Sequence, residues 1–201
     1  MAPPLAADDA SPSTISVLFV CLGNICRSPM AEAVFTHLIE TWSQETQTDH
    51  PVVKIDSAGT GAYHIGSPPD PRTMDTLQDH GITKFRHAAR QVKRQDFERF
   101  DYIIGMDGMN VQDLKRKARQ VKVIDDVGDQ ISLFGSWDAA SGGDEIDDPY
   151  YGGDEGFEMA FEQCVRFSRG WMKSVLGVDA VIDAKGSVTV RKIEGSDVGR
   201  L

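Results

Sequence analysis

The sequence predicts an α/β domain of the doubly wound type, in which helices cover both faces of a four-stranded parallel sheet. Two observations support this prediction. Short apolar runs rich in β-branched residues alternate along the chain with segments of helical periodicity. The first of these runs leads directly into a tight loop and then a helix, so the connection to the next strand is a right-handed crossover. A chain of 201 residues suffices for one such domain with a sizeable core.

The elements are predicted in chain order from apolar runs, helical periodicity and turn residues. Pro29 suits the first position of the first helix, because its missing N–H has no partner there in any case. Asp154 is expected to cap the last helix. The expected strands are residues 15–20, 52–55, 101–106 and 121–124, which form a small flavodoxin-like sheet. The expected helical segments are residues 29–44, 72–80, 95–99, 111–117, a short patch at 131–134, and the helix that begins at Asp154.

The two ends of the chain differ from its middle. Residues 1–12 are mostly Ala, Pro, Asp and Ser without periodicity, which predicts a disordered extension. Residues 13–177 hold the predicted domain. Residues 178–201 form a C-terminal extension in which 180–193 alternate about Lys185 and Gly186. This alternation is compatible with a hairpin or with a mobile tail, and the sequence does not decide between them.

Composition and charge narrow the classes of function. The net charge of −10 and the pI near 4.9 disfavour nucleic acid and anionic membranes as partners. The N-terminus has no basic region of a secretory signal, and no apolar run is long enough to span a bilayer. Three cysteines are too few for a disulfide scaffold, so a cytoplasmic location is expected.

The loop between Cys21 and Arg27 has the composition of a phosphoryl-transfer site. Its five intervening residues can curl so that backbone N–H groups and the following helix N-terminus face an anion. Cys21 would be the nucleophile, and these groups would lower the pKa of its thiol below the usual value of about 8.5. Arg27 offers a planar fork to two phosphoryl oxygens. The remaining candidates for the phosphate-binding loop are Leu22, Gly23, Asn24, Ile25, Cys26 and Ser28. The simpler interpretation of Cys21 is a buried core cysteine after a strand.

Asp148 is the candidate general acid. It precedes Pro149, and residues before proline are pushed to extended conformations, which would aim the carboxyl group from its loop. Tyr150 and Tyr151 follow and can line a cleft for a phenyl ring. The neighbouring Asp147 is also acidic, and Asp-Pro is often only a turn.

The string at residues 21–35, CLGNICRSPMAEAVF, resembles the signature of the low-molecular-weight protein tyrosine phosphatases. The resemblance continues through residues 56–60, 66–70, 87–91, 100–104, 106–107 and 148–151, and covers about residues 14–177. It implies that Asp148 is the acid, because the family's acid directly precedes the proline. It also makes Tyr63 a wall of the substrate cleft, and His87 and Asp107 supporting residues near the loop. Finally, it suggests a reversible disulfide between Cys26 and Cys21.

The implied activity is metal-independent hydrolysis of phosphotyrosine and small aryl phosphates, an acid phosphatase chemistry that forms a cysteinyl-phosphate and releases inorganic phosphate. No cofactor and no metal site are expected, and the oligomeric state is open, with a monomer expected. Peptides, small aryl phosphates and flavin phosphate all remain as substrates.

Three rival functions are weighed against it. An arsenate reductase would need redox cysteines that residues 75–110 lack. A protein arginine phosphatase resembles the family but has Thr where this loop has Ile25. A non-catalytic phosphotyrosine-binding module would be expected to lack the nucleophile or the acid.

Overall fold

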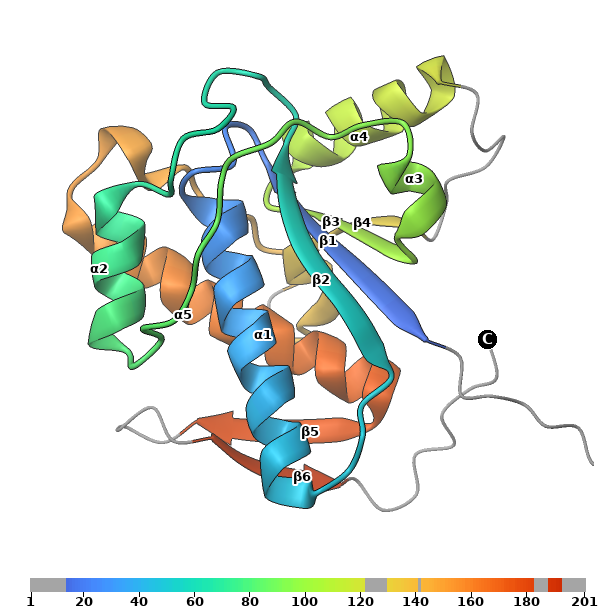
Figure 1. Cartoon of the computed structure of the whole chain (residues 1–201), viewed down its shortest axis with the longest axis vertical. Helices are drawn as coiled ribbons and strands as arrows, with labels where there is room; N and C mark the ends of the chain where they lie inside the picture. The colour runs from blue at the N-terminus through green and yellow to red at the C-terminus, as the bar shows by residue number, and fades with distance from the viewer. Residues whose placement is uncertain (1–13, 122–129, 141, 183–187, 193–201) are drawn as a thin grey trace, which may run out of the picture.

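A computed structural model of the chain describes residues 14–121, 130–140, 142–182 and 188–192. Its centre is a four-stranded parallel sheet in the order β2-β1-β3-β4 (Figure 1). The strands are β1 (Ile15–Cys21), β2 (Val52–Gly59), β3 (Tyr102–Gly105) and β4 (Ile131–Leu133). Cys21 is therefore the last residue of a central strand, at the edge where parallel α/β sheets bind ligands.

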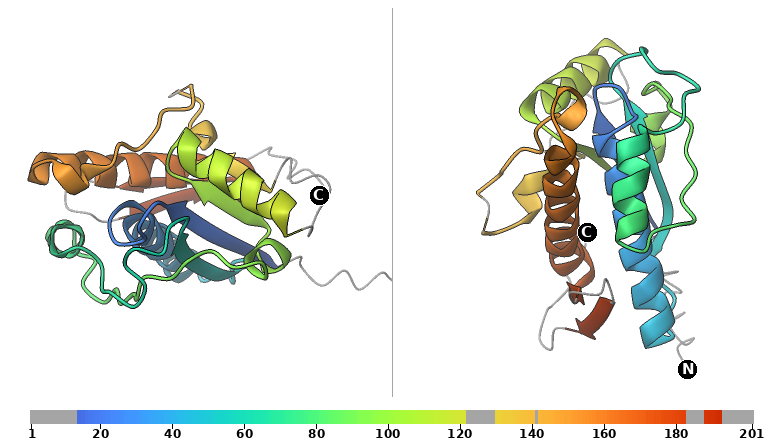
Figure 2. Two further views of the ribbon diagram at one scale, coloured as in Figure 1. Left: turned by 90° about the horizontal axis from the view of Figure 1, so that it is seen from above. Right: turned by 90° about the vertical axis from the view of Figure 1, so that its left-hand side faces the viewer.

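Helices cover both faces of the sheet, as predicted. Alternate residues of β1 supply two separate cores: Val17 and Phe19 face one, and Leu18 and Val20 face the other. The first core is covered by α1 (Arg27–Thr46), α2 (Pro71–Asp79) and α5 (Asp154–Trp171). The second is covered by α3 (Asp96–Arg99) and α4 (Gly108–Gln120), as Figures 1 and 2 show.

Several boundaries differ from the prediction. Helix α1 begins at Arg27, so Pro29 lies in its first turn and not at its first position. Strand β2 continues to Gly59, because its C-terminal half pairs with β1. Gly153 is the N-cap of α5, and Asp154 is its first residue, where a carboxylate still favours the helix dipole.

The structure corrects the prediction for the segment around β4. The predicted helical patch at 131–134 is wrong, since residues 131–133 form β4 beside β3, and a 3₁₀ turn (Phe134–Trp137) follows. Three residues are too few to show any periodicity, so only the pairing with β3 distinguishes the two states. The strand predicted at 121–124 lies almost wholly outside the described residues, and Val121 is the C-cap of α4.

The C-terminal segment forms an antiparallel pair. A π-helical turn (Met172–Leu176) extends α5, and β5 (Val178–Ile182) then pairs with β6 (Val188–Lys192). Val178 and Ala180 belong to the first core, so β5 is anchored to the domain. The pair lies near the C-terminal end of α1, far from the end of β1 that carries Cys21 (Figure 1). The predicted disorder of residues 1–12 lies outside the described residues, and no described helix is long and apolar enough to cross a membrane.

The close approach of α5 to the Trp137 turn gives a test of this packing. A Cβ atom at Gly170 would lie 2.2 Å from the carbonyl oxygen of Trp137. In an open helix Gly→Ala stabilises by about 1 kcal/mol. We expect Gly170→Ala to lower the free energy of unfolding by about 1–3 kcal/mol instead, because backbone must move. Met159→Ala, at a position of α5 that is 62% exposed, is the control and should change stability by less than about 0.5 kcal/mol. Urea denaturation measures both, and a stabilised Gly170→Ala protein would contradict the packing.

Candidate active site

The loop between β1 and α1 forms a cup with free amide groups. Its carbonyl groups are held from outside: those of Cys21, Leu22 and Ile25 accept backbone N–H groups of Thr60, Gly61 and Asp70 at 2.8, 2.9 and 2.8 Å. Within the described part of the chain, the N–H groups of residues 22, 23, 25 and 26 donate to no acceptor. Together with the start of α1, these amides make a site for a tetrahedral anion.

Cys21 lies at the base of this cup and is only 3% exposed. The N–H of Asn24 donates to its Sγ at 3.2 Å, and the Ser28 Oγ lies 3.1 Å from the same sulfur. The Ser28 hydroxyl also lies 3.3 Å from the Ala58 carbonyl and accepts a bond from the Asn24 amide. The hydroxyl's single proton can be donated to this carbonyl or to the sulfur, and a thiolate sulfur, which can only accept, would take it. Two donors converge on Sγ, an arrangement that stabilises a thiolate.

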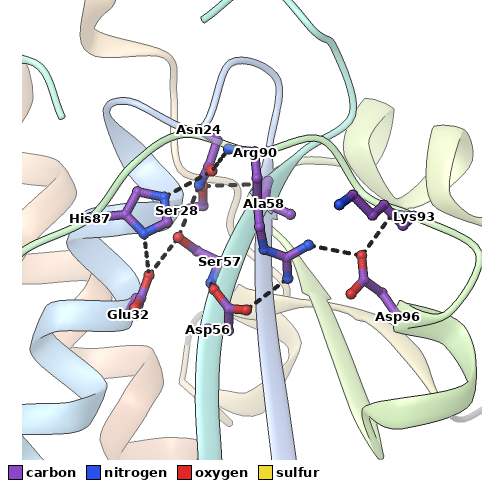
Figure 3. A network of polar contacts seen from close by, with 10 residues as sticks. All are labelled: Asn24, Ser28, Glu32, Asp56, Ser57, Ala58, His87, Arg90, Lys93 and Asp96. Atoms are coloured by element: carbon purple, nitrogen blue, oxygen red, sulfur yellow. Dashed lines mark hydrogen bonds and ion pairs between the residues drawn. The ribbon is translucent and has the colours of Figure 1, made fainter. Parts of the chain in front are cut away.

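Asn24 holds the loop in shape. Its φ of 59° places a non-glycine residue in the left-handed region. Its buried side chain donates to Ser28 Oγ and Ser57 Oγ, both at 2.9 Å, and its Oδ1 accepts from His87 Nε2 at 2.9 Å and from the Arg90 N–H at 2.8 Å (Figure 3). All four capacities of the amide are used, and they fix its orientation. The same bonds require that His87 Nε2 carries a hydrogen.

An outer layer of charges surrounds this amide (Figure 3). His87 Nδ1 faces the Glu32 carboxylate at 3.2 Å, and the Arg90 guanidinium pairs with Asp56 and Asp96, both at 2.9 Å. The ligand-type atoms of Glu32, Asp56 and His87 lie within 4.8 Å of one another, the one such group in the described chain. Each of these three side chains already has a partner in the network of Figure 3, and this network holds the Asn24 side chain in its orientation. His87 thus acts on the loop through Asn24.

Arg27 is held in place by carboxylates. It is 3% exposed, and its Nη1 donates to Asp107 at 2.6 Å and to the Ile146 carbonyl at 3.0 Å, while its Nη2 donates to Asp148 at 2.9 Å. Burial works against the charged guanidinium, but the Cys21 thiolate, Asp148 and Asp107 outweigh it and raise the pKa of Arg27. Its Nε donates to none of the described residues, and Nη2 uses one of its two hydrogens for Asp148, so Nε and the second Nη2 hydrogen remain for phosphoryl oxygens.

The cup opens into a cleft of about 490 Å³. The three tyrosines expected as its walls all line it, Tyr63 and Tyr151 being 76% and 94% exposed and Tyr150 38% exposed. Asp148 lines the same cleft with Cys21 and Arg27, and its Oδ1 accepts the N–H of Tyr150 at 3.2 Å. The structure therefore brings the candidate nucleophile, arginine and acid to one cavity.

The other two cysteines differ sharply from the nucleophile. Burial, with the negative charges of Asp70, Cys21 and Asp148, raises the pKa of Cys26 to about 12. Burial also raises the pKa of Cys164, which lies in the core under the loop. Both remain thiols at neutral pH, so Cys21 is the one candidate thiolate. All three are free, and the Cys21–Cys26 disulfide remains a prediction.

Some functional positions were missed by the sequence reasoning. His64 lines the cleft and its ring lies 6.2 Å from that of Tyr150. Asp70 and Arg72 link the phosphate loop to the loop that carries Asp148. The one local signal for Asp70 and Arg72 was the Asp-Pro-x sequence, which is typical of a capped helix start. In the structure Asp70 caps α2 by accepting the N–H of Arg72 at 2.9 Å.

This fold and site define an α/β protein with an anion-binding loop built on a cysteine and an arginine. The family model described as low molecular weight phosphotyrosine protein phosphatase matches residues 16–179. The low molecular weight phosphotyrosine protein phosphatase of Gallus gallus is 49% identical over 158 residues, which are 79% of this chain and 94% of that protein. The chain belongs to this family.

Solved structures of two phosphatases share the fold of this chain. A protein tyrosine phosphatase from Entamoeba histolytica is 32% identical, with a TM-score of 0.68 over 81% of this chain and 97% of that one. A Drosophila arginine phosphatase is 33% identical, with a TM-score of 0.69 over 79% and 96% of the two chains. The fold is thus shared by one protein described as a tyrosine phosphatase and one described as an arginine phosphatase.

The Asn24 hydrogen bonds can be tested by two substitutions. Asn24→Gly accepts the left-handed backbone but removes four side-chain bonds, so we expect a loss of about 2–4 kcal/mol in the free energy of unfolding. Asn24→Ala adds the left-handed strain and should lose about 1 kcal/mol more. Urea denaturation and binding of inorganic phosphate measure both effects. If both variants were as stable as the unsubstituted protein, the loop would owe its shape to something else.

Proposed function

We propose that this protein hydrolyses phosphotyrosine and small aryl phosphates through a cysteinyl-phosphate on Cys21. One observation supports this above the others: the Cys21 sulfur lies at the base of a cup of free amides, in one cleft with Arg27 and Asp148. The enzyme acts as a metal-independent protein tyrosine phosphatase.

In the first step the Cys21 thiolate attacks phosphorus, and the bond from phosphorus to the aryl oxygen breaks. Arg27 and the loop amides hold the equatorial phosphoryl oxygens, whose charge they stabilise. Asp148 gives its proton to the leaving oxygen.

In the second step water attacks phosphorus, and the bond from sulfur to phosphorus breaks. Asp148 now takes a proton from the water, and inorganic phosphate is released. The Ser28 hydroxyl and the Asn24 N–H stabilise the departing thiolate. This chemistry needs a reduced Cys21, so we infer that the protein works in a reducing compartment such as the cytoplasm.

The cleft favours an aromatic phosphate over a phosphoguanidine. Its walls are Tyr63, Tyr150 and Tyr151, which can stack on a phenyl ring, and Ile25 adds an apolar side chain to the lining. A phosphoguanidine would need a hydrogen-bond acceptor near the loop, and among the described residues Asp148 is the one carboxylate in the lining. The substrate class is therefore an aryl phosphate.

Asp148→Ala should slow hydrolysis of phosphotyrosine peptides by about 10²- to 10⁴-fold, the usual size of general acid catalysis. The loss should shrink as the leaving group becomes more acidic, because an acidic phenol leaves without a proton. Asp147→Ala, at the exposed neighbouring carboxylate, is the matched control and should do little. The measurement is kcat/KM for a series of aryl phosphates with EDTA present.

Two outcomes would contradict the proposal. A leaving-group-dependent loss in Asp147→Ala, with Asp148→Ala unaffected, would move the acid by one position. A kcat/KM on a phosphoarginine peptide above that on the matched phosphotyrosine peptide would change the substrate class.

A further inference from the structure

Arg72 joins two parts of the active site, the phosphate loop that begins at Cys21 and the loop that carries Asp148. It lies in the first turn of α2, next to the N-cap Asp70, and its side chain is 32% exposed. Its Nε donates to Asp70 Oδ1 and its Nη2 to Asp70 Oδ2, both at 3.0 Å. Asp70 also accepts the N–H of Arg72. This bidentate pair has the strongest geometry available to an arginine and a carboxylate, and it fixes the plane of the guanidinium.

From this fixed position Arg72 reaches the loop that carries Asp148. Its Nη1 donates to the Gly152 carbonyl at 3.2 Å, and its Nη2 donates to the Tyr150 carbonyl at 3.1 Å. The guanidinium also lies 4.4 Å from the ring centre of Phe157, a buried residue of α5. The backbone of Tyr150 is therefore held on both sides: its N–H donates to Asp148, and its carbonyl accepts from Arg72.

The other end of the link is the phosphate loop. The N–H of Asp70 donates to the Ile25 carbonyl at 2.8 Å, and the Thr73 hydroxyl reaches the same oxygen at 3.4 Å. The start of α2 is thus bound to the loop that holds Cys21. One chain of contacts runs from Ile25 through Asp70 and Arg72 to the acid loop, and Figure 1 shows α2 next to the segment that precedes α5.

A second contact between the phosphate loop and the acid loop, the ion pair of Arg27 with Asp148, changes in strength during the proposed reaction. Arg27 binds the carboxyl group of Asp148 itself, which gains and loses a proton in each turnover, so the strength of this contact varies. Arg72 binds only backbone carbonyls of the acid loop, and these do not titrate. The strength of the Arg72 link therefore does not depend on whether Asp148 carries a proton.

We propose that Arg72 is a positioning residue that holds the Asp148 loop at a fixed distance and angle from the phosphate loop. The proposal rests on Asp148 being the general acid. A carboxyl group must lie within hydrogen-bond reach of the leaving oxygen, and a misplacement of about 1 Å costs up to a hundredfold in rate. Loss of the link should therefore affect proton transfer and leave phosphate binding intact.

The test is Arg72→Lys, which keeps the positive charge but loses the fork that joins Asp70 to the two carbonyls. We expect kcat/KM for phosphotyrosine peptides to fall about 10- to 100-fold, and the defect to vanish for aryl phosphates with strongly acidic leaving groups. The inhibition constant of inorganic phosphate should stay within about twofold, since the loop and Arg27 are untouched. Arg86→Lys, at a residue whose side chain bonds only the neighbouring Phe85 carbonyl among the described residues, is the control and should be unchanged.

A double substitution separates this proposal from the assignment of Asp148. In the Asp148→Ala protein, Arg72→Lys should cause no further loss on phenyl phosphate, because no acid remains to be positioned. An equal loss in both backgrounds, or a defect that does not depend on the leaving group, would show that Arg72 is only structural and would overturn the proposal. If Asp148→Ala itself shows no dependence on the leaving group, the assignment of the acid fails and the Arg72 proposal fails with it. If Asp148→Ala shows the expected dependence on the leaving group but Arg72→Lys leaves kcat/KM unchanged, only the Arg72 proposal is overturned.

Discussion

The hydrogen bonds of the Asn24 side chain are the constraint on which the site depends. They hold one loop residue in the left-handed region at φ 59°, so the chain reverses and the following amides turn inward. Without that reversal, the carbonyls that bind Thr60, Gly61 and Asp70 would not all point outward. The charged groups around His87 and Arg90 do not line the cleft, yet they act on it because they fix the partners of this one amide.

The electrostatic potential in the site is positive, whereas the net charge of the whole molecule is negative. The chain carries −10, but the cup contains amide groups, a helix N-terminus and Arg27. Burial works against the charge of this guanidinium, but the Cys21 thiolate, Asp148 and Asp107 raise the pKa of Arg27, so it stays charged although buried. A phosphate dianion therefore meets a local positive field in an acidic protein, which favours small, strongly charged groups and repels extended polyanions.

The fold and the core of the site were predictable because their signals are local. The phosphate loop, the arginine and the start of α1 lie within eight consecutive residues, from 21 to 28, and the strand before them is a plain apolar run. The missed features depend on contacts across the chain. Arg72 meets Tyr150 and Gly152 from about 80 positions away, and β4 is a three-residue strand defined only by its pairing with β3. Neither leaves a periodic or spaced pattern in the sequence.

The most direct test is to trap the phosphorylated enzyme. The Asp148→Ala protein would be mixed with a radiolabelled aryl phosphate that has an acidic leaving group. With the base for water removed, the second step slows and the intermediate accumulates. After denaturation and digestion, mass spectrometry and the label should place one phosphate on the peptide that contains Cys21, with none in a Cys21→Ser control. A label on another residue, or turnover with no labelled protein at any time, would contradict the account.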